Sequence, residues 1–145
     1  TDDYTVEEMK IHNGSAILPL EDRGYYFSGR SIDDGLQREV AVKSSEIYQA
    51  MGKPLIKILS LVLSVLKETP PEIAADIMDH GIVLSGGGSR LAGMDQFLSQ
   101  ELGVPVLVAP NPELAVVTGA GKALHDRDKL GALIEGPERV YRRRF

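Results

Sequence analysis

The 145-residue chain contains no cysteine, so disulfide bonds, thiol catalysis and metal sites built on thiolates are excluded. It also lacks an excess of basic residues, since its formal net charge is -5 at pH 7. That charge argues against a protein that binds nucleic acid through a basic surface, and we expect no nucleic-acid partner. The three histidines, His12, His80 and His125, lie far apart and lack the spacing of metal ligands, so we expect no metal site.

Targeting and membrane-spanning segments are also missing from the sequence pattern. The first three residues, Thr1-Asp2-Asp3, are polar and acidic, unlike a signal peptide. The longest apolar stretch, residues 55–66, is interrupted by Lys57 and is shorter than the roughly 20 residues that span a bilayer. We therefore expect a cytoplasmic protein. Because the first residue is not methionine and lies inside an expected helix, we also expect a fragment or a processed chain.

What is present is the composition of an ordinary globular protein, with 43% hydrophobic and 26% charged residues. The first helix is expected from about residue 6 to Asn13, where Asn13-Gly14 is a typical helix end. Residues 24–30 and 36–43 have the pattern of strands, and the Asp-Gly turn between them predicts a β-hairpin.

A long apolar segment follows the hairpin. We expect a helix that opens at Ser44 or Ser45 as the N-cap and breaks at Gly52. Pro54 then restarts a helix that continues to residue 68 and is apolar almost all round. Such a helix is expected to be buried on several sides, against a sheet and a second element. Another short helix is expected after Pro70-Pro71, ending near residue 78.

Three consecutive glycines stand at the centre of the chain. The apolar run 82–84 predicts a buried strand, which stops at Gly86, Gly87 and Gly88, and an amphipathic helix is expected from about residue 92. Glycines leave the backbone bare, so such a turn can bring a ligand against peptide amides near the positive end of a helix. The pattern alone is equally consistent with a nucleotide or phosphate contact at Gly86–Ser89 and with a tight connection between strand and helix.

Beyond the glycines, a strand is expected over residues 104–108 and a helix from about residue 111. That helix is rich in small residues, and glycines inside a helix cost about 1 kcal/mol each relative to alanine. We therefore expect Gly119 and Gly121 to permit a close approach, most simply to the glycine turn. The basic end, residues 139–145, is expected to be a solvated tail, with an anionic membrane surface or nucleic acid as the alternative contact.

Taken together, these motifs resemble the C-terminal part of the MreB family, the bacterial actin-like proteins that determine rod shape. The longest matching run covers residues 69–88, from Thr-Pro-Pro-Glu to the three glycines. The other matches are Leu-Gly-Val-Pro-Val at 102–106, the helix end at 118–124, and Glu7 to Ile11 followed by Gly14-Ser15-Ala16. The resemblance covers roughly residues 4–125.

The resemblance implies an α/β fold: the second domain of an actin-like, ribonuclease H-like ATPase, with a mixed sheet flanked by helices and a small inserted α+β subdomain. It also implies a division into three parts. Residues 1–52 hold the inserted subdomain and a helix on the adenosine side, and residues 53–126 form an α/β subdomain with the glycine motif. Residues 127–145 form a C-terminal tail. It also implies ATP as the ligand, with Mg²⁺ bound mainly by the half of the family's fold that precedes this chain.

The site residues implied by the family lie in two segments. Gly86, Gly87, Gly88 and Ser89 match the adenosine motif, while Glu7 and Lys10 match helix side chains that reach the adenosine. A carboxylate accepts hydrogen bonds from ribose hydroxyls, and lysine donates them. The alternative for Glu7 and Lys10 is a surface charge pair. No catalytic residue is expected, because nothing in this chain replaces the family's phosphate loops or its water-activating side chain.

We therefore expect an inactive chain that binds nucleotide weakly or not at all by itself. As part of an MreB-type protein it is expected to polymerise into filaments that govern cell shape, at the inner face of the membrane and with a membrane-bound cell-shape partner. Two alternatives stay open at this point. One is a non-catalytic actin-like assembly module, and the other is the C-terminal lobe of a sugar kinase or Hsp70-type ATPase.

Overall fold

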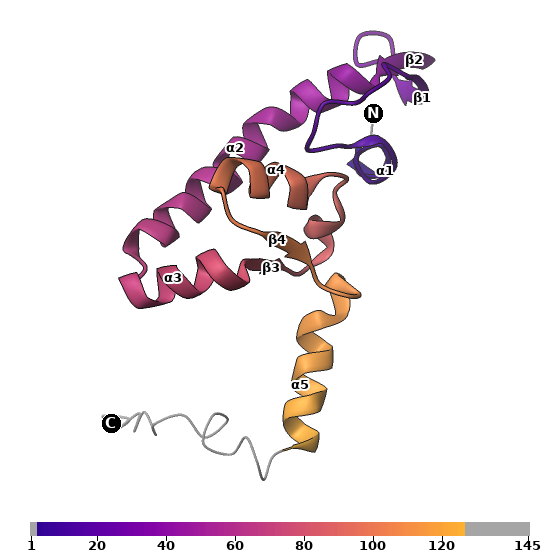
Figure 1. Ribbon diagram of the computed structural model, residues 1–145. Helices are drawn as coiled ribbons and strands as arrows, with labels where there is room; N and C mark the ends of the chain where they lie inside the picture. The colour runs from indigo at the N-terminus through magenta and orange to yellow at the C-terminus, as the bar shows by residue number, and fades with distance from the viewer. Residues whose placement is uncertain (1–2, 127–145) are drawn as a thin grey trace, which may run out of the picture.

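A computed structural model describes residues 3–126 of the chain as a mixture of helices and short strands (Figure 1). At one end, helix α1 lies beside a β-hairpin, and the long helix α2 leads from there to the other elements. In chain order the elements are α1 Asp3–Asn13, β1 Gly24–Arg30, β2 Gln37–Lys43, α2 Ser44–Glu68, α3 Pro71–His80, β3 Ile82–Leu84, the 3-10 turn η1 Gly87–Arg90, α4 Met94–Leu102, β4 Val106–Val108, the 3-10 turn η2 Pro112–Leu114 and α5 Ala115–His125.

The predicted hairpin is confirmed. Strands β1 and β2 pair antiparallel, from Gly24 opposite Lys43 to Arg30 opposite Gln37. Gly35 occupies the left-handed region with φ +70°, which a residue without a Cβ adopts at little cost. Its N–H donates to the Ser31 carbonyl at 3.0 Å, and the Arg30 Nε donates to the Gly35 carbonyl at 2.7 Å. The turn residues thus close the loop as the sequence pattern predicted.

The expected break at Gly52 is wrong, because α2 runs without interruption from Ser44 to Glu68. The residues of α2 that face the core recur every four residues on both sides of the glycine: Ile47, Met51, Leu55 and Leu59. One continuous helix places all four on the same face, where they are buried or half-buried. Pro54 lies on the exposed side of the helix, where water can reach the backbone carbonyl that proline leaves unpaired.

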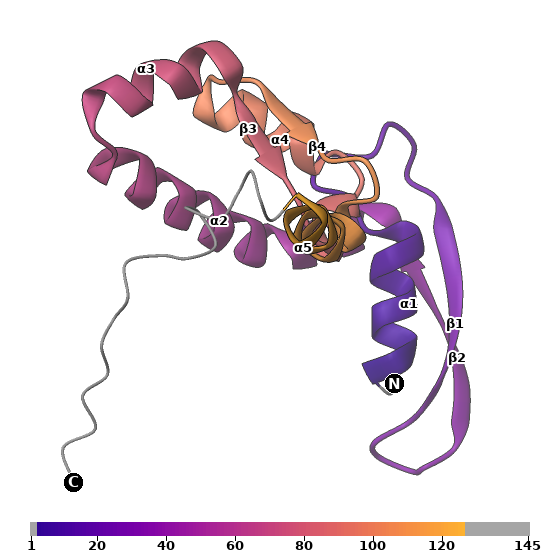
Figure 2. The same ribbon diagram turned by 90° about the horizontal axis from the view of Figure 1, so that it is seen from below.

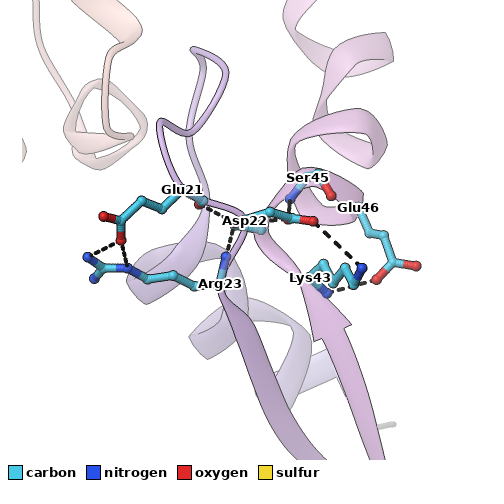
Figure 3. A network of polar contacts seen from close by, with 7 residues as sticks. Glu21, Asp22, Arg23, Lys43, Ser45 and Glu46 are labelled. Carbon is cyan, nitrogen blue, oxygen red and sulfur yellow. Dashed lines mark hydrogen bonds and ion pairs between the residues drawn. The ribbon is translucent and has the colours of Figure 1, made fainter.

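The N-terminus of α2 is capped by the preceding loop, not by its own serines (Figure 3). The Asp22 carboxylate accepts a hydrogen bond from the Ser45 N–H at 3.0 Å. Ser44, one of the two expected caps, instead uses its hydroxyl inside the loop, donating to the Glu21 carbonyl at 3.1 Å. Glu46 completes the arrangement by accepting from the Lys43 N–H at 2.7 Å. The loop competes for the serine hydroxyl and supplies a charged cap in its place.

The expectation that α2 is buried on several sides is also wrong. One stripe of the helix packs into the core, while Ile56, Leu61 and Val65 are 61%, 67% and 59% exposed. Although the apolar stretch 55–66 is short, the whole helix is long and apolar enough to cross a membrane, judged by length and composition alone. The described residues do not supply the second layer that its apolar character led us to expect.

The core lies where α2, α4 and a small parallel sheet meet (Figure 2). Strands β3 and β4 pair in parallel, with Ile82 opposite Val106 and Leu84 opposite Val108. Helix α4 connects the two strands and packs against them. The buried residues of this core are Ala16, Leu55, Met94, Leu98, Val104 and Val106.

The proposed boundary between residues 52 and 53 lies inside α2, and the division into subdomains stays a prediction. The basic tail at residues 127–145 lies outside the described residues.

Candidate functional site

The glycine turn follows β3 directly and leads through η1 toward α4. Gly86 has φ +85° and ψ 159°, a conformation that side chains strongly disfavour. Its N–H donates to the Pro112 carbonyl at 2.7 Å, which ties the turn to η2. The amphipathic helix begins at Met94, slightly later than expected, because the 3-10 turn comes first.

The space in front of the glycines is open. A Cβ atom added to Gly86, Gly87 or Gly88 would meet no other heavy atom of the described structure within 4 Å. Gly81 is different, because its Cβ would lie 2.3 Å from the Pro105 carbonyl oxygen. Close packing inside the chain therefore explains the glycine at 81 but not those at 87 and 88. The open space leaves room for a contact outside the chain, and a nucleotide contact at Gly86–Ser89 stays a prediction.

Ser89 is a different kind of residue from the glycines before it. It is 8% exposed, and its Oγ donates to the Gly86 carbonyl at 2.7 Å. Its N–H donates to the same carbonyl at 3.1 Å. The serine thus holds the shape of the turn from inside, and its direct contact with a ligand stays a prediction.

An ion pair that the sequence did not reveal fixes the other end of the turn. Arg90 donates from Nε to one carboxylate oxygen of Glu113 at 2.8 Å, and its Nη2 lies 2.8 Å from the other oxygen. A hydrogen bond from the backbone N–H of Glu113 itself, followed by the Arg90 contact, lowers the pKa of the Glu113 carboxyl. The two residues are 23 positions apart, so no local pattern could have predicted the pair.

Glu7 and Lys10 form an ion pair on α1, with 2.7 Å between Oε2 and Nζ, and both side chains are about half exposed. The end of this helix is tied to the segment after the glycines. Ser15 and Ala92 form an isolated parallel bridge, and the Ala16 N–H donates to the Ala92 carbonyl at 2.7 Å. The backbone thus joins the segment that follows α1 to the segment that follows the glycine turn, while the binding role of Glu7 and Lys10 stays a prediction.

The small residues of α5 do not approach the glycine turn. A Cβ on Gly119 or Gly121 would meet nothing within 4 Å, so the expected close contact is wrong for the described structure. Figure 1 shows α5 extending away from the sheet and α4. Gly119 and Gly121 lie in the middle of this helix.

The acidic residues and histidines of residues 3–126 form no cluster of three that would suit a metal ion.

Comparison with known proteins decides the family. A sequence model described as MreB/Mbl protein matches residues 2–132, which is most of the chain. The chain belongs to the MreB/Mbl family. The cell shape-determining protein Mbl of Bacillus subtilis (strain 168) is 40% identical over 126 residues, 87% of this chain and 38% of Mbl. MreB of Escherichia coli (strain K12) is 41% identical over 127 residues, 88% of this chain and 37% of that MreB.

Solved structures of the MreB/Mbl family have the same fold. MreB5 of Spiroplasma citri bound to ADP superposes with a TM-score of 0.82 at 30% identity, over 94% of this chain and 41% of that one. The same protein bound to AMPPNP gives a TM-score of 0.81, over 90% of this chain and 40% of that one. The actin-like assignment of the fold is thereby confirmed. The chain spans about two fifths of the length of these relatives.

Proposed function

We propose that this chain forms the adenosine side of the nucleotide site of an MreB/Mbl-type protein. The observation that carries the proposal is the open space in front of Gly86, Gly87 and Gly88, in a turn that is bonded to η2 through Gly86 and Arg90. The similarity to MreB5 structures bound to ADP and AMPPNP supports a nucleotide as the occupant. Bare glycines allow the flat contact that a base and sugar require.

In this proposal each side chain has a distinct task. Gly86 to Gly88 provide the contact surface, and Ser89 holds the turn that presents them. Glu7 accepts hydrogen bonds from ribose hydroxyls, and Lys10 donates to the nucleoside. The phosphates and Mg²⁺ are bound mainly by the part of an MreB/Mbl protein that this chain does not match. This chain alone then has no ATPase activity.

The same proposal extends to the cellular role. As part of an MreB/Mbl-type protein, the chain assembles into cytoskeletal filaments that govern cell shape. These filaments lie in the cytoplasm at the inner face of the membrane, with a membrane-bound cell-shape protein as partner. The named roles of the relatives Mbl and MreB in determining cell shape support this assignment.

Amide chemical shifts of the isotope-labelled full chain test the nucleoside contact, because they report weak binding. Adenosine and ADP are each expected to shift the amides of Gly86, Gly87 and Gly88 at millimolar concentration. Tripolyphosphate is expected to leave them unchanged. The Gly87→Val variant should lose the response, because its φ is not left-handed and its Cβ meets only open space, so the fold accepts the valine while the ligand does not.

Gly119→Val is the matched control, since its Cβ also meets nothing within 4 Å but lies in α5. That variant should bind adenosine like the parent chain. Shifts caused by tripolyphosphate but not by adenosine would assign the turn to phosphate and contradict the proposal. Micromolar affinity with hydrolysis of ATP would show that the chain holds the catalytic half as well.

A further inference from the structure

The outward face of α3 is acidic and exposed. Helix α3 contains no buried residue, and Figure 1 shows it at the margin of the described structure. Glu72, Asp76 and Asp79 follow one another at helical spacing, so their carboxylates lie along one face of the helix. All three residues are exposed, and within residues 3–126 their carboxylates have no ion-pair partner. We call this row of carboxylates the acidic face of α3.

An apolar side chain, Ile73, borders the acidic face and is 52% exposed. Residues 73 and 76 are neighbours one turn apart on the helix, so a single partner can contact both. The partner that suits this face is a segment with several cations and an apolar side chain among them. Arginine is the best cation for such a face, because its planar guanidinium donates two parallel hydrogen bonds to one carboxylate.

The end of this chain has that composition. Residues 139–145, the basic end, read Arg-Val-Tyr-Arg-Arg-Arg-Phe. The charge of the chain is also divided unevenly. Six of the 16 Lys and Arg residues and three of the 21 Asp and Glu residues lie in 127–145, so this segment carries +3 and the rest of the chain carries -8. The basic end is therefore attracted to the remainder of its own chain, whereas an anionic membrane repels that remainder.

The basic end is long enough to reach α3 of the same chain. Arg142 lies 16 residues beyond Asp126, the last described residue, and 16 extended residues span up to about 55 Å. The elements between Asp126 and the acidic face are shorter in total. Helix α5 has 11 residues, α3 has 10 and each strand between them has three, which gives lengths of about 16, 15 and 10 Å. The tether also raises the effective concentration of the basic end at α3.

We propose that the basic end binds the acidic face of α3 in the same chain. Its arginines pair with Glu72, Asp76 and Asp79, and one of its aromatic side chains covers Ile73. Each exposed ion pair contributes little by itself, so the contact depends on several pairs acting together and weakens as salt is added. The basic end then controls access to α3, because any other cationic partner has to displace it.

A spin label beside the basic end tests this contact. The chain has no cysteine, so one introduced cysteine takes the label at a single site, and Gly136→Cys leaves the basic end intact. In the labelled full chain the amide signals of residues 72–79 are expected to lose most of their intensity. The signal of Ile32, which is fully exposed at the hairpin tip, should keep its intensity. In 1 M salt, where the Debye length is about 3 Å, the signals of α3 should return.

Charge reversal tests whether the ion pairs hold the contact. Arg142→Glu with Arg143→Glu should abolish the loss of signal on α3, because like charges then face one another. Adding Asp76→Lys and Asp79→Lys to that variant should restore the loss, since the pairs are formed again with their charges exchanged. Both changes on α3 are at exposed helix positions, so the fold accepts them.

Lys53→Glu with Lys57→Glu is the matched control, because both lysines are exposed on α2 and the net charge changes by the same amount. This variant should lose the α3 signals as the parent chain does. Sharp α3 signals in the labelled parent chain would overturn the proposal. An equal loss in a mixture of spin-labelled and isotope-labelled chains would place the basic end on a second copy instead. Tail signals that respond to phosphatidylglycerol vesicles while α3 stays sharp would assign the basic end to a membrane. None of these outcomes depends on the nucleoside contact.

Discussion

Arg90 and Glu113 hold the glycine turn against η2, the 3-10 turn that precedes α5, through two short contacts. Both carboxylate oxygens of Glu113 lie 2.8 Å from a guanidinium nitrogen. The side chains are 59% and 43% exposed, so solvent screens the pair and its net contribution is small. Its value lies in orientation, because two parallel contacts restrict both side chains at once.

Reversing one charge of this pair is expected to weaken adenosine binding about three- to fivefold, which corresponds to the upper range for an exposed pair. Arg90→Glu places two carboxylates together, so the turn loses its side-chain anchor to η2 and keeps only the backbone bond from Gly86 to Pro112. The double variant Arg90→Glu with Glu113→Arg should recover most of the affinity. The titration is followed by the amide shifts of the glycines. If Arg90→Glu binds adenosine as tightly as the parent chain does, Arg90 does not position the turn.

Arg23→Glu is the control for that experiment. Arg23 pairs with Glu21 at 2.9 Å in the loop before the hairpin, and its side chain is 70% exposed. Reversing its charge changes the net charge of the chain by the same amount and should leave adenosine binding unchanged. If both reversals weaken binding equally, the effect comes from overall charge and not from the anchor.

Helix α2 continues through residues that locally favour a break, because the segments before and after them pack into the same core. Gly52 and Pro54 each disfavour a helix interior, yet the stripe of residues at four-residue spacing continues through them into one core. The hairpin was predicted correctly because its turn and strands carry local signals. The cap at Asp22 and the ion pair of Arg90 depend on residues that are distant in sequence. Those contacts could not be predicted from the pattern along the chain.

The same helix supplies a prediction about stability. Gly52→Ala should raise the free energy of unfolding by about 0.5–1 kcal/mol, because alanine loses less backbone entropy in a helix. The new methyl group would meet nothing within 4 Å, so no clash offsets the gain. Urea unfolding of the full chain measures the change.

Gly81→Ala is the matched control, with φ +79° and a Cβ that would lie 2.3 Å from a carbonyl oxygen. It should lose at least about 1 kcal/mol, because both the conformation and the space exclude a methyl group. A destabilised Gly52→Ala would indicate that the glycine is needed for a bend or a contact that the helix makes elsewhere.

For the molecule as a whole, its carboxylates link the separate parts and make stability depend on pH. Asp22 caps α2, Asp34 bonds within the hairpin turn and Glu113 anchors the glycine turn. The Ser45 N–H lowers the pKa of Asp22, and the Leu36 N–H lowers that of Asp34. Glu113 is shifted in the same direction. Three distant regions thus respond to acid in the same sense.

The sign follows from linkage. Because the pKa of each carboxyl is lower in the folded chain, the unfolded chain binds more protons in acid. The carboxylates therefore stabilise the folded chain above their ordinary pKa, and this stabilisation is lost as the pH falls through the lowered pKa. The urea midpoint is therefore expected to be constant between about pH 7 and 6 and to fall below about pH 4. Asp22→Asn should flatten this fall, because asparagine caps a helix without titrating. Asp22→Ala should instead lower the midpoint at neutral pH, and its difference from the parent chain should shrink in acid, where the parent loses its charged cap. Equal slopes for the parent chain and Asp22→Asn would show that the cap of α2 contributes nothing to the acid response, leaving Asp34 and Glu113 to account for it.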